Sequence, residues 1–385
     1  MRYILFRMKR FCGFATGLVF FISGILKLMD PVGAGLVMKE YFKFLHLGFL
    51  SFSSQAFGVA FALAEVIVGA GLITGVWRKV MARVAICLQS VFTLLTLILV
   101  IFNPEMDCGC FGEAVHLSHG QTFVKNIILL ALLLIYYIPS DKLGETRKKK
   151  YVSFGLVSLS SIAFALYSIM YIPMVDFTDF KPGTMVNKTS LASGDAYEAV
   201  FVYEKDGKEQ TFTLEELPDS TWTFVRTQTH STVTEAKQPA SISIYDRNGN
   251  YADSLITEGK SIVVSVYKDN ISNKDQEKIL RFLDNVAAAG FRPILLSTSV
   301  DFDSEYHYFC DYKTLITLNR SNGGATYIDD GYIIRKWAKK TLPDHEELAM
   351  LSEEDSTDTF IGRDTRSNLA FQGFLLYVFA VMLLL

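Results

Sequence analysis

The sequence predicts a mainly α-helical membrane protein: a four-helix transmembrane bundle with additional spans and a soluble α/β domain. Three observations lead to this prediction. Half of the 385 residues are hydrophobic and the mean hydropathy is positive, which is unusual for a soluble protein. Apolar runs close to the ~20 residues that a bilayer core requires recur along the chain. A long polar stretch, residues 173–368, separates the last two runs and has room for a soluble domain.

The first apolar run, residues 11–29, follows a short basic amino terminus. It resembles the core of a signal peptide, but no small-residue cleavage site follows it and more spans do, so we expect a retained helix. Further runs predict spans over residues 56–77, 80–102, 122–138, 151–172 and 369–385. The last of these is barely long enough to cross a bilayer.

The short loops carry most of their Lys and Arg residues on one side of the predicted spans, and the loop 30–55 on the other side has only Lys39 and Lys43. The residues on the first side are Arg7, Lys9, Arg10, Arg78, Lys79, Arg83, Lys142 and the basic cluster 147–150. Lys and Arg concentrate in cytoplasmic loops, so we expect a cytoplasmic amino terminus and an external region 173–366. In a bacterium this arrangement corresponds to a multi-pass inner-membrane protein whose soluble domain lies in the oxidising periplasm. The net charge of −3, without basic clusters interleaved with aromatic residues, gives no indication of nucleic-acid binding.

Two cysteines one residue apart follow the third apolar run, in the sequence Asp107-Cys108-Gly109-Cys110-Phe111-Gly112. Two thiols at this spacing can form a small, strained disulfide, and Gly109 supplies the backbone freedom that such a ring needs. Strained disulfides are easily reduced, so Cys108 and Cys110 are candidate catalytic residues. The alternatives are a structural disulfide or half of a metal site. We predict no metal, because no His or second Cys pair stands at zinc-like spacing.

Four ionisable residues are candidate supporting residues. Lys27 and Glu65 lie in the first two apolar runs, where ionisable groups usually face the bundle, form pairs and serve function. The alternative is that Lys27 only reaches the interface and Glu65 only fixes helix packing. His116 and His119 follow the cysteines, where an imidazole could shuttle protons or stabilise a thiolate, although a solvated loop histidine need have neither role.

These residues together resemble the DoxX/MauE family over about the first 140 residues. The resemblance depends on Ser23-Gly24-Ile25-Leu26-Lys27-Leu28-Met29-Asp30-Pro31, on Ala64-Glu65 with Gly69 and Gly75, and most specifically on Cys108-Gly109-Cys110-Phe111-Gly112. It implies a four-helix membrane domain over residues 1–140, with Gly109, Phe111 and Gly112 supporting the cysteine pair. The MauE branch is associated with methylamine utilisation and with disulfide formation in a periplasmic dehydrogenase subunit. Such a resemblance indicates chemistry more safely than pathway.

The chain after the bundle divides into five further segments. Residues 141–174 are expected to form a basic cytoplasmic loop and the fifth span, and residues 175–259 a strand-rich periplasmic segment that begins with the linker 176–183. Within this segment, apolar alternation over 197–203 and 210–214 around Asp206-Gly207 predicts a hairpin. Residues 260–350 form the α/β domain, 351–368 a linker and 369–385 the last span.

The α/β domain is predicted as a βαβ unit followed by a hairpin. Strands are expected over 261–267 and 293–297, with a helix between them that Asn273 caps and Gly290 ends. A helical stretch over 306–318, a hairpin of 326–328 with 332–337 and a helix from Asp344 complete the domain. This order resembles a thioredoxin-like domain, but the turn 268–273 contains no Cys-x-x-Cys, and Gly323-Gly324-Ala325 stands where a proline is usual. We therefore expect a non-catalytic domain, with Cys310 as a core residue on a helix face.

The sequence thus predicts a membrane redox protein that exchanges disulfides or electrons between periplasmic thiols and a membrane acceptor through Cys108 and Cys110. It would act as a thiol–disulfide oxidoreductase, with a periplasmic thiol or disulfide protein as partner and a quinone as the candidate acceptor. Two alternatives remain open. One is a small-molecule transporter that uses Lys27 and Glu65, although the main spans show neither discontinuous helices nor an internal repeat. The other is a membrane-anchored scaffold or binding protein, although a pure anchor needs only one span.

Overall fold

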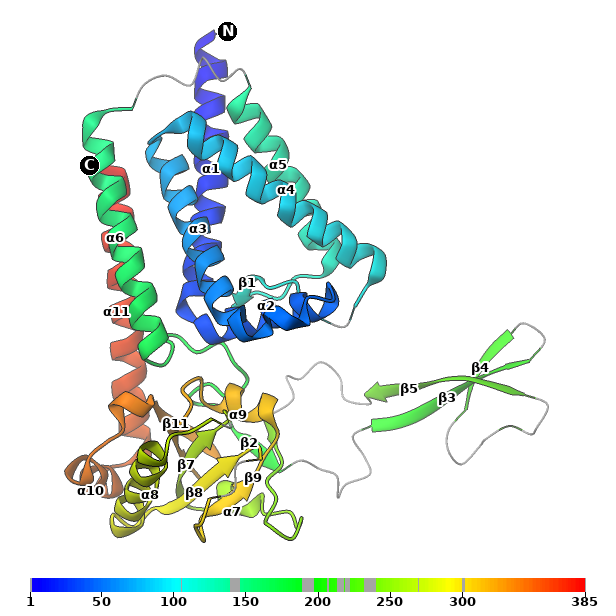
Figure 1. Ribbon diagram of the computed structural model, residues 1–385, viewed down its shortest axis with the longest axis vertical. Helices are drawn as coiled ribbons and strands as arrows, with labels where there is room; N and C mark the ends of the chain where they lie inside the picture. The colour runs from blue at the N-terminus through cyan, green and yellow to red at the C-terminus, as the bar shows by residue number, and fades with distance from the viewer. Residues whose placement is uncertain are drawn as a thin grey trace.

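The computed structural model describes residues 2–104, 106–138, 146–188, 197–205, 208–212, 218, 222–231, 240–268, 270–299 and 302–384. Apolar helices lie at one end and an α/β domain lies at the other (Figure 1). Within the described residues, five helices are long and apolar enough to cross a membrane. They are α1 (Arg2–Met29), α3 (Ser54–Thr74), α4 (Arg78–Phe102), α5 (His119–Tyr137) and α6 (Lys148–Met170). Each overlaps one of the first five predicted spans. The cluster 147–150, expected in a loop, mostly belongs to the first turn of α6.

Helices α1 and α3 pack closely because glycines remove side chains from their contact. A Cβ atom on Gly24 would lie 2.6 Å from the carbonyl oxygen of Ala62, and one on Gly69 would lie 2.6 Å from the backbone nitrogen of Phe21. Without a strong hydrophobic driving force in lipid, such backbone contact is a main source of helix association. This contact fixes the two helices that carry Lys27 and Glu65.

A helix that the sequence analysis did not predict, α2 (Pro31–Phe44), runs across the end of the bundle nearest the soluble domain (Figure 1). Asp30 caps it by accepting a hydrogen bond from the Gly33 N–H at 2.9 Å, and Pro31 occupies its first turn. The short 3₁₀ helix η1 (Gly48–Ser53) follows and exposes Phe49 and Phe52. The predicted external loop between the first two spans is therefore largely helical.

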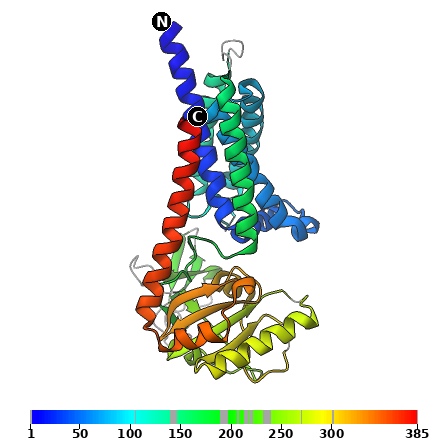
Figure 2. The same cartoon turned by 90° about the vertical axis from the view of Figure 1, so that its left-hand side faces the viewer.

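The final helix, α11 (Ser356–Leu384), corrects the expected linker over 351–368. Its apolar part, Leu369–Leu383, is shorter than the five candidate spans. It lies antiparallel beside α6, since Lys150 Nζ donates to the Met382 carbonyl at 2.9 Å and the Phe164 and Phe374 rings stack near the other end (Figure 2). Residues 351–368 were predicted to be a linker because they are polar. They contain no proline, however, so a helix can run through them.

The soluble domain contains a five-stranded sheet in the order β11-β10-β7-β8-β9. Strands β7 and β8 are parallel, as are β8 and β9, whereas β10 is antiparallel to both β7 and β11. The strands are β7 (Lys260–Val266), β8 (Arg292–Ser297), β9 (His307–Phe309), β10 (Gly324–Asp329) and β11 (Tyr332–Trp337). This is the predicted βαβ unit followed by a hairpin.

Helices cover both faces of this sheet. On one face, Ile279, Leu283 and Val286 of α8 (Asn273–Ala288) pack against β7 and β8 together with α10 (His345–Glu353). On the other face lies α9 (Tyr312–Leu318). The turn η4 (Lys339–Thr341) follows β11.

Three details of this domain differ from the prediction. The cap of α8 is Ser272 rather than Asn273, since the Ser272 side chain accepts a hydrogen bond from the Asp275 N–H. The predicted helical stretch 306–318 begins instead with β9, because these residues extend the parallel edge of the sheet beside β8. Cys310 is buried as expected, but it lies between β9 and α9 rather than on a helix face.

The segment before the sheet contains its own strands. Strand β2 (Val186–Lys188) pairs in parallel with β6 (Ala240–Ile242), and the helix α7 (Ser254–Thr257) precedes β7. Strands β3 (Tyr197–Lys205), β4 (Lys208–Phe212) and β5 (Thr223–Ser231) form an antiparallel sheet that projects to one side (Figure 1). The predicted pairing of the first two is confirmed, whereas Asp206, Gly207 and Leu214 lie outside the described residues. The expected linker 176–183 packs on the domain, where Phe180 is buried in its core.

Candidate functional site

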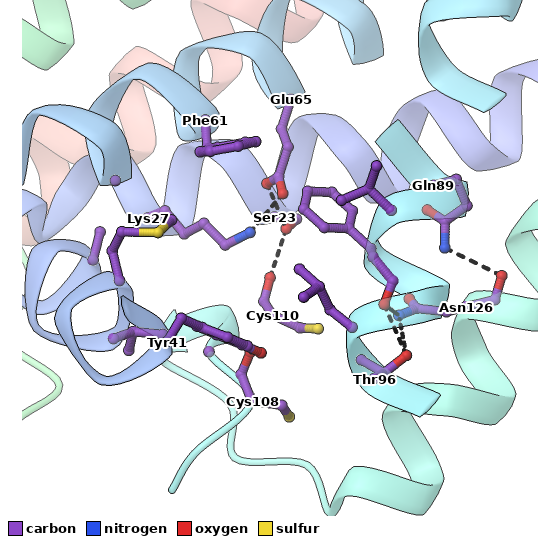
Figure 3. A pocket seen from close by; sticks show the side chains of 18 of the residues that line it. Ser23, Lys27, Tyr41, Phe61, Glu65, Gln89, Thr96, Cys108, Cys110 and Asn126 are labelled. Carbon is purple, nitrogen blue, oxygen red and sulfur yellow. Dashed lines mark hydrogen bonds and ion pairs between the residues drawn. The ribbon is translucent and has the colours of Figure 1, made fainter. Parts of the chain in front are cut away.

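A cavity of about 250 Å³ lies inside the helix bundle (Figure 3). Residues of α1, α2, α3, α4, α5 and the cysteine loop line it. Most of its wall is apolar, and includes Val19, Phe20, Phe61, Phe92, Leu95 and Leu129. Its polar groups are Ser23, Lys27, Tyr41, Glu65, Gln89, Thr96, Cys108, Cys110, Lys125 and Asn126. The cavity thus combines apolar walls with the two thiols and the two intramembrane charges that the sequence indicated.

The cysteine loop enters the cavity through a tight turn. Gly109 has a φ of +58°, and a Cβ atom there would collide with Val37 of α2. The Gly112 N–H donates to the Gly109 carbonyl at 3.2 Å, and Gly112 has a φ of +61°. Glycine adopts such positive φ values at little cost, so the turn favours glycine at both positions. Strand β1 (Cys110–Glu113) then continues from the turn.

Lys27 and Glu65 form an ion pair at the cavity wall. Lys27 Nζ lies 2.6 Å from Glu65 Oε1, and the Glu65 side chain is only 3% exposed. Ser23 Oγ lies 2.8 Å from Glu65 Oε2 and 2.6 Å from the carbonyl oxygen of Cys110. A hydroxyl has one proton, so Ser23 can donate to only one of these acceptors at a time. Lys27, Glu65 and Ser23 thus form a row of polar groups that ends at the backbone of the cysteine loop.

The two thiols are free and differ in character. Cys108 is buried, and its Sγ lies 2.9 Å from Thr122 Oγ1 and 3.1 Å from the Leu117 carbonyl oxygen. A hydrogen bond from the Cys110 thiol lowers the pKa of Cys108 to about 5; burial opposes this shift and the Thr122 hydroxyl adds to it. The same hydrogen bond between the cysteines, together with burial, raises the pKa of Cys110. Cys108 is therefore the thiolate of the pair at neutral pH.

The two loop histidines have different surroundings. His119 begins α5, and its Nε2 lies 2.9 Å from the Met106 carbonyl oxygen; its charge, when protonated, also favours the Cys108 thiolate. His116 instead pairs with Asp107 at 3.5 Å, and both side chains are more than half exposed. Phe111 contacts Lys125, whose Nζ lies 4.6 Å from the ring centroid. The structure thus brings His119, but not His116, close to the thiols.

Three polar residues at the thiols did not enter the sequence prediction. The Tyr41 hydroxyl donates to the Cys108 carbonyl at 3.0 Å, Thr122 contacts Cys108, and Lys125 faces the cavity from α5. The helix that carries Tyr41 could have been predicted from Asp30-Pro31, because Asp followed by Pro is typical of the start of a helix. No local signal marks Thr122 or Lys125, because they reach the thiols only after α5 packs on the loop.

Polar side chains also join α4 to α5 beside the cavity. Asn126 Nδ2 lies 3.2 Å from Thr96 Oγ1, and Gln89 Nε2 donates to the Asn126 carbonyl at 3.1 Å. Such hydrogen bonds between membrane helices hold the wall that faces Ser23 and Glu65. Among the residues that the structure describes, no three His, Cys, Asp or Glu side chains gather as a metal site would require.

Comparison with known families gives two matches. Residues 4–139 match the family model described as methylamine utilisation protein MauE. Residues 197–233, which span β3 to β5, match a domain of unknown function, DUF8463. No curated protein and no solved structure matches the chain significantly. The MauE match spans α1 to α5 and therefore includes every residue that lines the cavity.

Proposed function

We propose that this chain is a membrane thiol–disulfide oxidoreductase, in which Cys108 and Cys110 pass disulfides or electrons between periplasmic thiols and a membrane acceptor. The observation that carries the proposal is the acidic thiol of Cys108 beside Cys110 in an apolar cavity among membrane helices. The match to MauE suggests a membrane protein in methylamine utilisation, and the proposed chemistry agrees with it. The inner membrane is the proposed location, with the soluble domain in the periplasm.

The difference between the two thiols favours one order of exchange. In the oxidised protein, a partner thiolate attacks Cys110 and the Cys108 sulfur leaves, because the thiol with the lower pKa is the better leaving group. A second partner thiol then attacks the mixed disulfide and releases Cys110. The partner loses two electrons and two protons and gains a disulfide, while Cys108 and Cys110 become a dithiol.

Reoxidation of the dithiol requires a two-electron acceptor, and the acceptor that we propose is a quinone bound in the cavity. Phe61, Phe92 and Leu95 offer apolar walls for a flat ring, and Lys27 and Ser23 offer donors for a carbonyl oxygen. When bound, a quinone supplies an acceptor for two electrons and two protons. Glu65, held by Lys27 and Ser23, places a carboxylate inside the same cavity.

Cysteine variants of the full chain in lipid nanodiscs test the proposal. Oxidation of a dithiol peptide would be followed with a water-soluble quinone as oxidant. We expect Cys108→Ser and Cys110→Ser each to abolish turnover with little change in the thermal unfolding temperature, because the bundle packs without the disulfide. Neither single variant should form a mixed disulfide with the peptide, because one thiol alone cannot form the Cys108–Cys110 disulfide that the peptide thiolate attacks.

Cys87→Ser is the matched control, because Cys87 is an exposed residue of α4 that does not line the cavity. It should keep full turnover. Full turnover of the Cys108→Ser/Cys110→Ser double variant would exclude the redox function and favour the scaffold alternative.

A further inference from the structure

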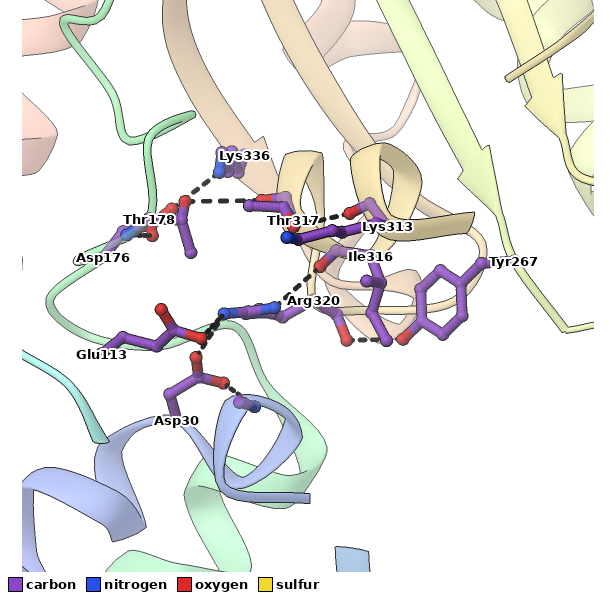
Figure 4. A network of polar contacts seen from close by, with 11 residues as sticks. Asp30, Glu113, Asp176, Thr178, Tyr267, Lys313, Ile316, Thr317, Arg320 and Lys336 are labelled. Atoms are coloured by element: carbon purple, nitrogen blue, oxygen red, sulfur yellow. Dashed lines mark hydrogen bonds and ion pairs between the residues drawn. The ribbon is translucent and has the colours of Figure 1, made fainter. Parts of the chain in front are cut away.

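A buried arginine of the soluble domain reaches the cysteine loop (Figure 4). Arg320 follows α9, and its side chain is only 4% exposed. Its Nη2 lies 2.8 Å from Asp30 Oδ2 and 3.2 Å from Glu113 Oε1. Its other terminal nitrogen, Nη1, donates to the Ile316 carbonyl at 3.3 Å, which fixes the guanidinium to α9. One side chain therefore joins three parts of the chain that are remote in sequence.

The two carboxylates belong to the elements that form the thiol site. Asp30 caps α2, and Glu113 ends β1, the strand that begins with Cys110. Burial raises the pKa of Asp30, and the charge of Arg320 opposes that rise. Arg320 and Asp30 are buried and Glu113 is partly buried, so separating the charges would leave the two buried groups desolvated and unpaired.

Helix α2 is a partition between the cavity and the soluble domain. Val37, Met38 and Tyr41 line the cavity from α2. Val32 and Leu36, on the other side of the same helix, pack against the core of the soluble domain. Lys39 Nζ also lies 5.1 Å from the ring centroid of Tyr312 in α9. The soluble domain therefore supports, from outside, the helix whose Tyr41 binds the Cys108 carbonyl.

We propose that Arg320 is a positioning residue of the thiol site: by binding Asp30 and Glu113, it holds α2 and the cysteine loop together and so sets the reactivity of Cys108. The soluble domain thereby takes part in the chemistry although it lacks a Cys-x-x-Cys. The consequence for turnover rests on the proposed function, but the reactivity of Cys108 does not.

Loss of Arg320 should weaken the thiolate. Two carboxylates without a counter-charge repel each other, so the start of α2 and the end of β1 separate and the contacts of Cys108 with Tyr41 and Thr122 loosen. The titratable groups around the thiols are Lys27 of α1, Tyr41 of α2, Glu65 of α3, His119 and Lys125 of α5, and Glu113 of the loop itself. All of them remain in an Arg320 variant, so a changed titration reports the arrangement of the loop.

The test measures the alkylation rate of Cys108 by iodoacetamide from pH 4 to 9, in the reduced full chain, with quantification of the labelled peptide by mass spectrometry. The thiolate is the reacting form, so the rate rises with pH through the pKa of Cys108. We expect a midpoint near 5 for the natural protein. For Arg320→Gln we expect the midpoint to rise by about one pH unit, which slows alkylation about tenfold below both midpoints.

Further variants make this result specific. Arg320→Lys keeps the charge but loses the planar fork that spans two carboxylates, so its midpoint should rise by less. Adding Glu113→Gln to Arg320→Gln removes one repelling charge and should restore part of the shift. Arg335→Gln is the matched control, because Arg335 is a cation of β11 that pairs with Glu347 of α10 at 3.0 Å. Its midpoint should not move.

An unchanged midpoint in folded Arg320→Gln would overturn the inference. If Arg320→Gln does not fold, an unchanged midpoint in Arg320→Lys would overturn it instead. The titration needs neither partner nor oxidant, so a shift would stand even if the cysteine variants kept full turnover and the proposed redox function failed.

Discussion

At the scale of single residues, the cavity joins an ion pair to a thiol pair in apolar surroundings. Lys27 and Glu65 come from different helices, and Ser23 connects Glu65 to the carbonyl of Cys110. A lone charge at the centre of a bilayer helix costs roughly 3 kcal/mol on insertion scales, and pairing offsets much of the cost of placing either residue in the membrane. The sequence identified both charges from their position in apolar runs, but their connection to the loop through Ser23 required the packed helices.

This pairing can be tested by a double-mutant cycle. Glu65→Gln and Lys27→Met should each destabilise the protein by roughly 3 kcal/mol, because each leaves one buried charge without its partner. The double variant should recover part of that loss, since it leaves no unpaired charge. The free energy of unfolding in detergent would be measured for all four proteins.

Lys125→Met serves as the control for this cycle, because Lys125 contacts the Phe111 ring rather than a carboxylate and should cost only about 1 kcal/mol. Strictly additive losses in the Lys27 and Glu65 variants would show that the two residues do not interact. Two silent single variants would also remove their functional role.

At the scale of elements, glycines set the distance between α1 and α3, and α2 closes the cavity toward the soluble domain. The apolar periodicity of the chain was enough to predict α1, α3, α4, α5 and α6, because a bilayer demands long helices with internally satisfied backbone groups. It was not enough for α2, a helix of 14 residues whose apolar side chains are divided between the cavity and the side that meets the soluble domain.

The close contact of α1 and α3 predicts opposite effects for two glycine substitutions. Gly69→Ala should destabilise the protein by about 1–3 kcal/mol, because the new Cβ atom would meet the backbone of Phe21. Gly155→Ala in α6 should be neutral or slightly stabilising, because nothing lies within 4 Å of its added Cβ atom and Ala favours the helix. Thermal unfolding in the same detergent would compare the two variants, and equal effects would refute the contact.

At the scale of the whole molecule, two antiparallel helices, α6 and α11, connect the two ends of the soluble domain to the membrane helices. Helix α6 leads from the bundle to the soluble domain, and α11 returns beside it (Figure 2). The soluble domain is thus attached by both of its ends as well as by Arg320. This attachment agrees with a domain that acts on the bundle rather than one that is merely tethered to it.

Thiol labelling tests the proposed orientation, in a variant whose own five cysteines are replaced by Ser. Lys274→Cys, on the exposed surface of α8, should react with an impermeant maleimide in whole cells once the outer membrane is permeabilised. Lys149→Cys should react only after the inner membrane is opened, because the positive residues before α6 are retained in the cytoplasm. Labelling of the Lys149 site alone would invert the orientation.

The sequence by itself determined the features that depend on neighbouring residues. Long apolar runs fixed the five candidate spans, the Cys-Gly-Cys spacing fixed the thiol pair, and local periodicity fixed the order of β7, α8, β8, β10 and β11. The tertiary structure decided the rest. Only folding brings Arg320 to Asp30 and Glu113, brings Thr122 to Cys108 and lays α11 along α6. These contacts join residues remote along the chain, and their strength comes from the exclusion of water when the helices and the domain pack, which no local pattern of residues encodes.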